Sequence, residues 1–140
     1  MNITKKLAEE MLNSGNELLV AAAKQAFPEL VKSNFEMACE RLNIDPFIPD
    51  GLSISMRAQY QLEKITEVAN EGWTPSMEDD DEYKYYPYFE FTEEGMVLDY
   101  VSFWASNTVV PAPSLFKSRE LCEKAVNDNI ELYRQMFLNK

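Results

Sequence analysis

The stretch YKYYPYFEFTEEGMVLDYVSFW, residues 83–104, decides the fold class. Residues 83–91 and 96–104 are rich in aromatic and aliphatic side chains that repeat with a period of two, which is typical of β-strands. TEEG at 92–95 supplies a short turn between the two runs, so together they predict an antiparallel β-hairpin. Because Pro87 has no N–H to donate to a ladder, we expect the first strand to lie at a sheet edge or to be bulged there.

The period of two divides the first strand into two faces, because successive side chains point to opposite sides. We expect one face to pack on a core, and it comprises Tyr83, Tyr85, Phe89 and Phe91. The opposite face should stay partly exposed, and it holds the candidate binding residues Lys84, Tyr86 and Tyr88. Exposed rings of this kind can stack the bases of single-stranded nucleic acid. Beside so many acids, they suit the recognition of a protein better.

The chain before the hairpin, residues 1–72, is predicted to be helical. Apolar residues recur at helical spacing over residues 3–26, with a kink or break expected at NSGN (13–16), because glycine lowers helix propensity. A second helix is expected to begin at Pro28, which suits a first helical turn. Its apolar stripe runs to about Leu42.

A connector separates this helix from the next one. NIDPFIPDG, residues 43–51, holds two prolines and an Asp-Gly pair, which exclude regular structure. Ser53 or Ser55 is expected to cap the helix that follows, since a serine hydroxyl accepts a hydrogen bond from a free backbone N–H. That helix should end near Gly72.

Beyond the hairpin, residues 105–114 form another connector, and a third short strand is a further expectation at Leu115-Phe116. Ser118 is expected to cap a final helix that packs on the sheet. The predicted fold is therefore α+β, with a helical N-terminal half, an antiparallel hairpin or three-stranded sheet, and a C-terminal helix. We expect residues 1–140 to form a single domain, in which residues 73–140 make up a ββ(β)α module.

Charge is the strongest property of the whole composition. The chain has 24 acids and 13 bases, a formal net charge of −11. Such a field repels a phosphate backbone, so duplex nucleic acid is an improbable partner, and a protein partner or self-association is favoured. No apolar run reaches the roughly 20 residues that a bilayer crossing needs, and the first residues lack the apolar segment of a signal peptide. We therefore expect a cytoplasmic protein with no membrane partner.

The residue inventory excludes several enzyme classes. With no histidine, neither a Ser-His-Asp nor a Cys-His arrangement can be built. The four glycines lie far apart, so no phosphate-binding glycine loop is present. Cys39 and Cys122 each fall on or beside the apolar face of a predicted helix, which is typical of reduced cysteines that pack in a core. We expect no cofactor.

A run of acids precedes the hairpin and offers weak candidates for metal binding: Asp79, Asp80, Asp81 and Glu82. Because these residues are consecutive and lack the glycine of a calcium loop, a hydrated loop is the better interpretation. A metal-dependent hydrolase that uses this run together with Asp99 remains an alternative. In a regular strand Asp99 shares a face with Val97 and Val101, so it would either be buried, with a raised pKa, or be exposed and paired with Lys84 or another cation.

Three motifs resemble those of a known group of proteins: GWTP (72–75), KYYPYF (84–89) and FKSREL (116–121). The group consists of small uncharacterised proteins from phages, prophages and mobile elements of Bacteroides-like gut bacteria, and the likeness covers about residues 70–138. It implies a phage-related origin and a shared ββ(β)α module, and it carries no catalytic residue. Members often have a glycine in the loop before KYYP, where this chain has the unbroken acids of residues 78–82.

The favoured hypothesis is a non-enzymatic, phage- or mobile-element-related accessory protein that acts by protein–protein interaction. The absence of a catalytic constellation, the acidity and the expected tyrosine face support it. Single-stranded nucleic-acid binding through Tyr86 and Tyr88 and the metal-dependent hydrolase are the alternatives.

Overall fold

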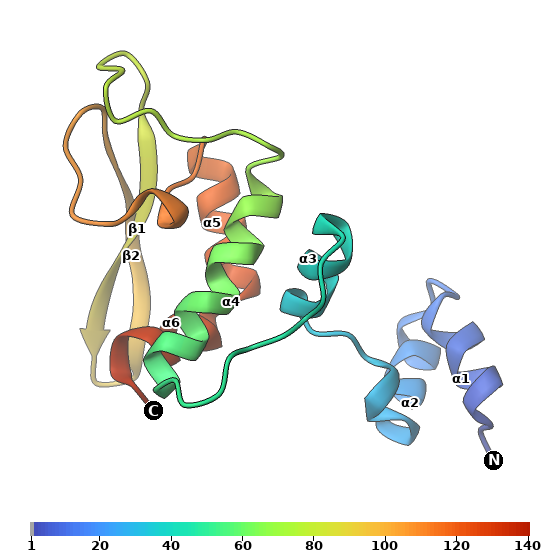
Figure 1. Cartoon of the computed structure of the whole chain (residues 1–140). Coiled ribbons are helices and arrows are strands. Elements are labelled where there is room, and N and C mark those ends of the chain that lie inside the picture. The colour runs from blue at the N-terminus through green and yellow to red at the C-terminus, as the bar shows by residue number, and fades with distance from the viewer. Residues whose placement is uncertain (1) are drawn as a thin grey trace. The chain divides into compact units, whose positions relative to one another are not determined.

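The structure is a computed structural model that describes residues 2–140. It divides into two compact units, one that ends at Ser33 and one that runs from Asn34 to Lys140. The first unit holds α1 (Lys5–Leu12), α2 (Glu17–Ala26) and the 3₁₀ turn η1 (Pro28–Leu30). The second unit holds α3 (Asn34–Leu42), α4 (Ile54–Ala69), β1 (Lys84–Thr92), β2 (Gly95–Trp104), η2 (Ala112–Ser114), α5 (Arg119–Asp128) and α6 (Ile130–Leu138) (Figure 1). The α+β class is confirmed.

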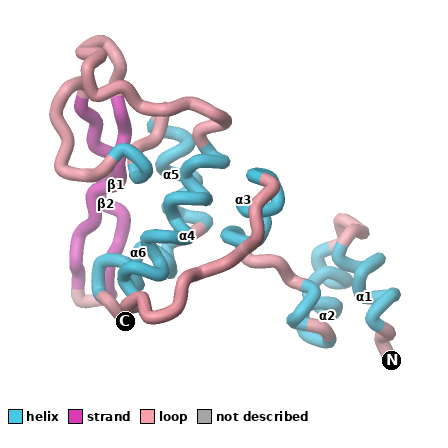
Figure 2. The backbone as a smooth tube through the Cα atoms, viewed as in Figure 1, coloured by secondary structure: helices cyan, strands magenta, loops and turns pink. Residues whose placement is uncertain are grey.

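The first unit is a pair of helices separated by the NSGN segment. Gly15 adopts a φ of +73°, a left-handed conformation that glycine accommodates without strain. Asn16 then caps α2, because its side-chain oxygen accepts hydrogen bonds from the backbone N–H groups of Leu18 and Leu19. The expected kink is thus a full break between α1 and α2, visible as a loop in Figure 2.

The helix expected from Pro28 to Leu42 is wrong, because the chain forms two shorter elements there. The turn that begins at Pro28 stops at Val31, whose backbone is extended (φ −87°, ψ 112°), and α3 starts afresh at Asn34. The connector 43–51 has no helix or strand, as predicted. Ser53 caps α4 by accepting from the N–H of Met56 at 3.1 Å.

The two strands form a twisted antiparallel hairpin (Figure 1). Within residues 2–140 the sheet has two strands, so each strand is an edge, as Pro87 suggested for β1. The expected third strand is reduced to one bridge between Tyr85 and Phe116, whose backbone groups exchange hydrogen bonds of 2.9 and 2.8 Å. The backbone N–H and C=O of Tyr85 point away from β2, and residues two apart on a strand point these groups to the same side. The backbone nitrogen of Pro87 therefore also points away from β2, so its missing N–H removes no hydrogen bond between β1 and β2.

A β-bulge interrupts the ladder just beyond Pro87. Tyr88 pairs with Tyr100, and the next pair joins Phe89 to Leu98. Asp99 is therefore the extra residue, with no partner across the ladder. Such a residue bends the strand and shifts the alternation of its side chains by one position.

The bulge decides between the two alternatives for Asp99 in favour of the exposed one. In a regular strand Asp99 would share a face with Val97 and Val101, but Val101 is buried in the core while Val97 is exposed. Leu98, three residues before Val101, packs against the same core, which a strand of period two would not allow. Asp99 itself is exposed.

The predicted final helix is broken into α5 and α6 at Asn129. Ser118 caps α5 as expected, accepting from the N–H of Leu121 at 3.2 Å. Asn129 has φ −132° and ψ 28°, and its side-chain amide donates to the carbonyl oxygen of Ala125 at 2.8 Å. This local bond competes with helix continuation, as asparagine often does. None of the helices within residues 2–140 has the length and apolar character that a bilayer crossing requires.

The main core of the second unit lies between the hairpin and the C-terminal helices. Its buried members are Leu62, Met96, Val101, Phe116, Cys122, Ala125, Val126 and Tyr133. Phe89 packs against α6, with its ring centroid 5.4 Å from those of both Tyr133 and Phe137. The expected burial of Phe89 beneath the last helix is confirmed, whereas Phe91 is 60% exposed and was placed wrongly.

Candidate functional site

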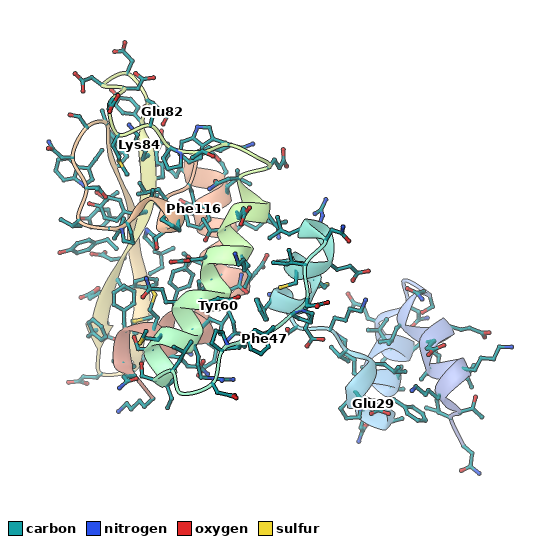
Figure 3. All side chains as sticks on the ribbon, in the orientation of Figure 1. Glu29, Phe47, Tyr60, Glu82, Lys84 and Phe116 are labelled. Atoms are coloured by element: carbon teal, nitrogen blue, oxygen red, sulfur yellow. The ribbon has the colours of Figure 1, made fainter. Side chains whose placement is uncertain are left out.

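Lys84 is a buried clamp and lies on no exposed binding face. Its side chain is only 1% exposed, and its Nζ donates hydrogen bonds to the backbone oxygens of Asp79 (3.0 Å) and Ala105. A carboxylate oxygen of Glu82 lies 3.9 Å from the same Nζ. Figure 3 shows Lys84 and Glu82 together at the open end of the hairpin, opposite its turn. The ammonium group thus joins the acid-rich loop to the segment that follows β2, which corrects its assignment as an exposed candidate.

Tyr86 is also buried, at 5% exposure, and its hydroxyl accepts a hydrogen bond from the indole N–H of Trp104. It lines a cavity of about 290 Å³ whose walls come from α4, α6, β1 and the 110–114 segment. Residues of α4, α6 and this segment thus lie around Tyr86, on the face that was expected to be free. The platform of Lys84, Tyr86 and Tyr88 that would stack bases is therefore not assembled.

Tyr88 is the one expected binding residue that the structure leaves accessible. Its side chain is 50% exposed and stacks on the equally exposed ring of Tyr100, with centroids 5.0 Å apart and planes at 23°. Glu90 and Val97, the cross-strand pair on the same face, lie next to these rings. We call Tyr88, Glu90, Val97 and Tyr100 the tyrosine patch.

The tyrosine patch is exposed because of the way the hairpin is covered. Helices α4, α5 and α6 lie beside the hairpin, and residues 110–114 of the connector after β2 join α4 and α6 around Tyr86 near its open end (Figure 1). The inward face beside the patch carries Phe89 and Leu98, which pack on the main core. All four patch residues are exposed. The two faces of the same short ribbon thus have different surroundings.

A second set of rings lies around the open end of the hairpin. Tyr83 and Phe103 meet edge to face, with centroids 5.1 Å apart. The guanidinium of Arg119 lies 5.7 Å from the centroid of Tyr85 and 6.0 Å from that of Phe103, and its Nη1 donates to the carbonyl oxygen of Val101 at 2.8 Å. The hairpin already holds one arginine of its own chain by stacking and hydrogen bonding.

The negative charge of the chain is concentrated in the hairpin and the loop before it. Residues 78–104 hold nine acids and one base, a net charge of −8 out of −11 for the whole chain. The one base is Lys84, which is buried, so the accessible charge of this segment is entirely negative. Bound anions are therefore disfavoured here and cations are favoured.

The acid run is used for loop structure. The Oδ1 of Asp79 accepts from the N–H of Asp81 at 2.9 Å, and Oε1 of Glu82 accepts from the N–H of Ser76 at 2.7 Å. Among the described residues, no group of three or more cysteine, aspartate or glutamate side chains is placed to hold a metal ion. The carboxylate nearest to Lys84 is that of Glu82, so Lys84 is not the cation that one alternative offered for Asp99.

The two thiols of the chain are buried. Cys39 and Cys122 are free thiols in separate clusters of the core. Burial raises the pKa of Cys122 to about 12, and it also raises the pKa of Cys39, so both thiols stay protonated at neutral pH. Burial likewise raises the pKa of Tyr133, which keeps its hydroxyl neutral.

Comparison of the chain with protein-family models, curated proteins and solved structures found no match.

Sequence reasoning missed Tyr100 as a member of the site. Counting back from the turn, where Thr92 pairs with Gly95, places Asp99 opposite Tyr88 in a regular ladder. The bulge moves the pairing by one residue and brings Tyr100 there instead. Glycine at a strand position can indicate a bulge, but the extra residue here is Asp99, so the sequence does not predict a bulge at this position.

Proposed function

We propose that this chain is a non-enzymatic accessory protein that works by binding another protein through the outer face of its hairpin. The observation that carries the proposal is the tyrosine patch, an exposed pair of stacked rings within a segment of net charge −8. Tyrosine is enriched at protein interfaces because it offers a large rigid area with a polar end. The resemblance of residues 70–138 to small phage and mobile-element proteins supports an accessory role of that origin.

The negative charge around the tyrosine patch favours a positively charged partner. A second copy of the chain, docked face to face, would bring two sets of like charges together at the same surface, which costs free energy. Nucleic acid meets the same repulsion, and the burial of Tyr86 removes one of its two expected stacking rings. A positively charged protein partner meets neither obstacle.

Affinity capture with matched variants tests the proposal. The immobilised protein is exposed to lysates of phage-infected and uninfected bacteria, and the retained proteins are identified by mass spectrometry. We expect a partner that the wild type retains and that Tyr88→Ser/Tyr100→Ser loses by about tenfold, since central interface rings often contribute about 1–2 kcal/mol or more. Phe47→Ser, at a ring that is 63% exposed in the 43–51 connector, serves as the control.

The result that contradicts the proposal is equally concrete. It is the absence of any protein retained more strongly by the wild type than by the tyrosine variant, although both are folded by circular dichroism. Capture that Phe47→Ser weakens as much as the tyrosine variant does would also refute the assignment to the hairpin face.

A further inference from the structure

We propose that the tyrosine patch binds arginine side chains of an extended, basic segment of the partner, an inference that rests on the proposed protein-binding function. Arginine would stack on the rings of Tyr88 and Tyr100 and donate hydrogen bonds to the carboxylates beside them.

The charge of the patch selects a cation. Glu90 belongs to the patch, and Asp99, the bulge residue, is exposed next to Tyr100. The only base among residues 78–104 is Lys84, and its ammonium already has two carbonyl oxygens and Glu82 as partners. Glu90 and Asp99 therefore face solvent with no base of the same segment available to them, and they are free to pair with an incoming cation.

The rings select arginine among the cations. The centroids of Tyr88 and Tyr100 are 5.0 Å apart with planes at 23°, so the pair presents a broad, nearly continuous π surface. A guanidinium is planar and weakly hydrated, so it can lie flat on such a surface while its N–H groups reach a carboxylate at the side. An ammonium is compact and strongly hydrated, so it gains less from the rings.

The chain contains an example of this recognition on the other face of the hairpin. Arg119 lies within 6.0 Å of the ring centroids of Tyr85 and Phe103 and donates to the carbonyl oxygen of Val101. The same combination of two rings and an oxygen acceptor recurs at the tyrosine patch, where the acceptors are carboxylates. The difference is that the cation–π contacts within residues 2–140 involve other rings, while Tyr88 and Tyr100 are each 50% exposed.

The spacing of the patch indicates an extended ligand. Tyr88 and Glu90 lie two residues apart on one strand face, a separation of about 7 Å. Side chains at alternate positions of an extended peptide that runs along β1 have the same spacing. A segment of the form Arg-x-Arg can therefore stack one guanidinium on the rings and pair the other with Glu90.

Fluorescence anisotropy with labelled peptides tests this inference on the full-length chain. The probes are a short peptide in which arginine alternates with threonine, a matched peptide with lysine in place of arginine, and a matched peptide with glutamate. We expect the arginine peptide to bind best and the glutamate peptide not to bind. Tyr88→Leu/Tyr100→Leu, which keeps apolar area and charge but removes the rings, should weaken the arginine peptide by about fivefold to tenfold.

A charge-matched pair of variants separates the patch from the general field of the protein. Glu90→Gln removes one carboxylate from the patch, and Glu10→Gln removes one from an exposed position of α1. Both variants change the net charge equally, so a loss of affinity confined to Glu90→Gln supports contact at the patch. Unchanged circular dichroism and urea midpoints establish that each variant is folded.

Two outcomes overturn the inference. One is the absence of binding of the arginine peptide to the folded wild type. The other is equal binding of the arginine and lysine peptides with no effect of the leucine substitutions, which would show attraction by charge alone. If the peptides fail while the captured partner is still lost by Tyr88→Ser/Tyr100→Ser, only the ligand class is wrong. If both experiments fail, the proposed function falls with it.

Discussion

Replacing Lys84 by methionine tests whether the buried ammonium holds the open end of the hairpin together. The side chain is 1% exposed, and its Nζ bonds the backbone oxygens of Asp79 and Ala105. Methionine keeps the buried stem but removes the charge and both hydrogen bonds. Alanine removes the stem as well, so the pair of variants separates packing from hydrogen bonding.

The magnitude follows from opposing contributions. Each hydrogen bond from a charged donor contributes about 1.5–3 kcal/mol, while the wild type bears a desolvation cost of several kcal/mol for the buried ammonium. Both acceptor carbonyls lie in loop segments that can turn to water once the ammonium is removed. We therefore expect Lys84→Met to lower the free energy of unfolding by about 1–2 kcal/mol. Lys84→Ala should cost about 2 kcal/mol more, because about three buried methylenes are lost at roughly 0.8 kcal/mol each.

Urea unfolding gives both free energies, and hydrogen exchange locates the effect. In Lys84→Met we expect faster exchange in the loop before β1 and in the 105–114 connector, with the α5 core unchanged. A methionine variant as stable as the wild type, with unaltered exchange in both loops, would refute the clamp. Equal losses in the methionine and alanine variants would show that the stem is not packed.

The other expectations concern the core, the thiols and metals. Phe116→Ala, at a fully buried ring, should lower the free energy of unfolding by about 3–5 kcal/mol; a loss below about 1 kcal/mol would contradict its burial. Asn70 donates to the carbonyl of Leu115 at 2.8 Å and accepts from the N–H of Lys117 at 3.1 Å, so Asn70→Asp, which loses the donor and buries a charge, should cost about 2–4 kcal/mol in urea unfolding. Because folding raises the pKa of Cys122 from 9.0 to about 12, the unfolded chain loses that proton first, and the free energy of unfolding should fall as pH rises from 9 towards 12. A stability difference between the wild type and Cys122→Ala that does not change with pH would argue otherwise. Thermal melts should not shift with Ca²⁺, Mg²⁺ or Mn²⁺, and a rise with any of them would revive the acid run as a metal site.

Local chemistry made much of the fold predictable. The hairpin followed from a period of two around a glycine-ended turn. Ser118 was placed correctly as a cap, and the cap of α4 is Ser53, one of its two candidates, because capping depends on a few neighbouring residues. The breaks at Val31 and Asn129 were not foreseen. Each depends on a backbone conformation within an otherwise helical pattern, and propensity alone decides such cases poorly.

The burial of Lys84 and Tyr86 could not be read from the strand that carries them. Alternation correctly assigned the two residues to one face, but whether that face is covered depends on segments outside the strand, namely α4, α6 and the connector after β2. Lysine is seldom fully buried, so the residue type of position 84 also favoured exposure. The structure satisfies its ammonium with backbone oxygens of two loops, an arrangement that no local motif encodes.

The candidate site was half predictable. The acidity of the hairpin region and the accessibility of Tyr88 followed from the sequence, since both belong to single residues. The partner ring of Tyr100 did not, because a cross-strand neighbour depends on register, and register depends on a bulge without a sequence signature.

The unpaired bulge residue of β2, Asp99, also means that this strand could be one residue shorter and keep its pairing with β1. Were Asp99 deleted, Leu98 and Tyr100 would become consecutive, and ordinary alternation would keep each on its present side of the ribbon. The folding pattern thus has no requirement for a residue at this place. What Asp99 supplies is local curvature and an exposed carboxylate next to Tyr100 in the chain, so shortening the chain there would probe recognition without changing the core.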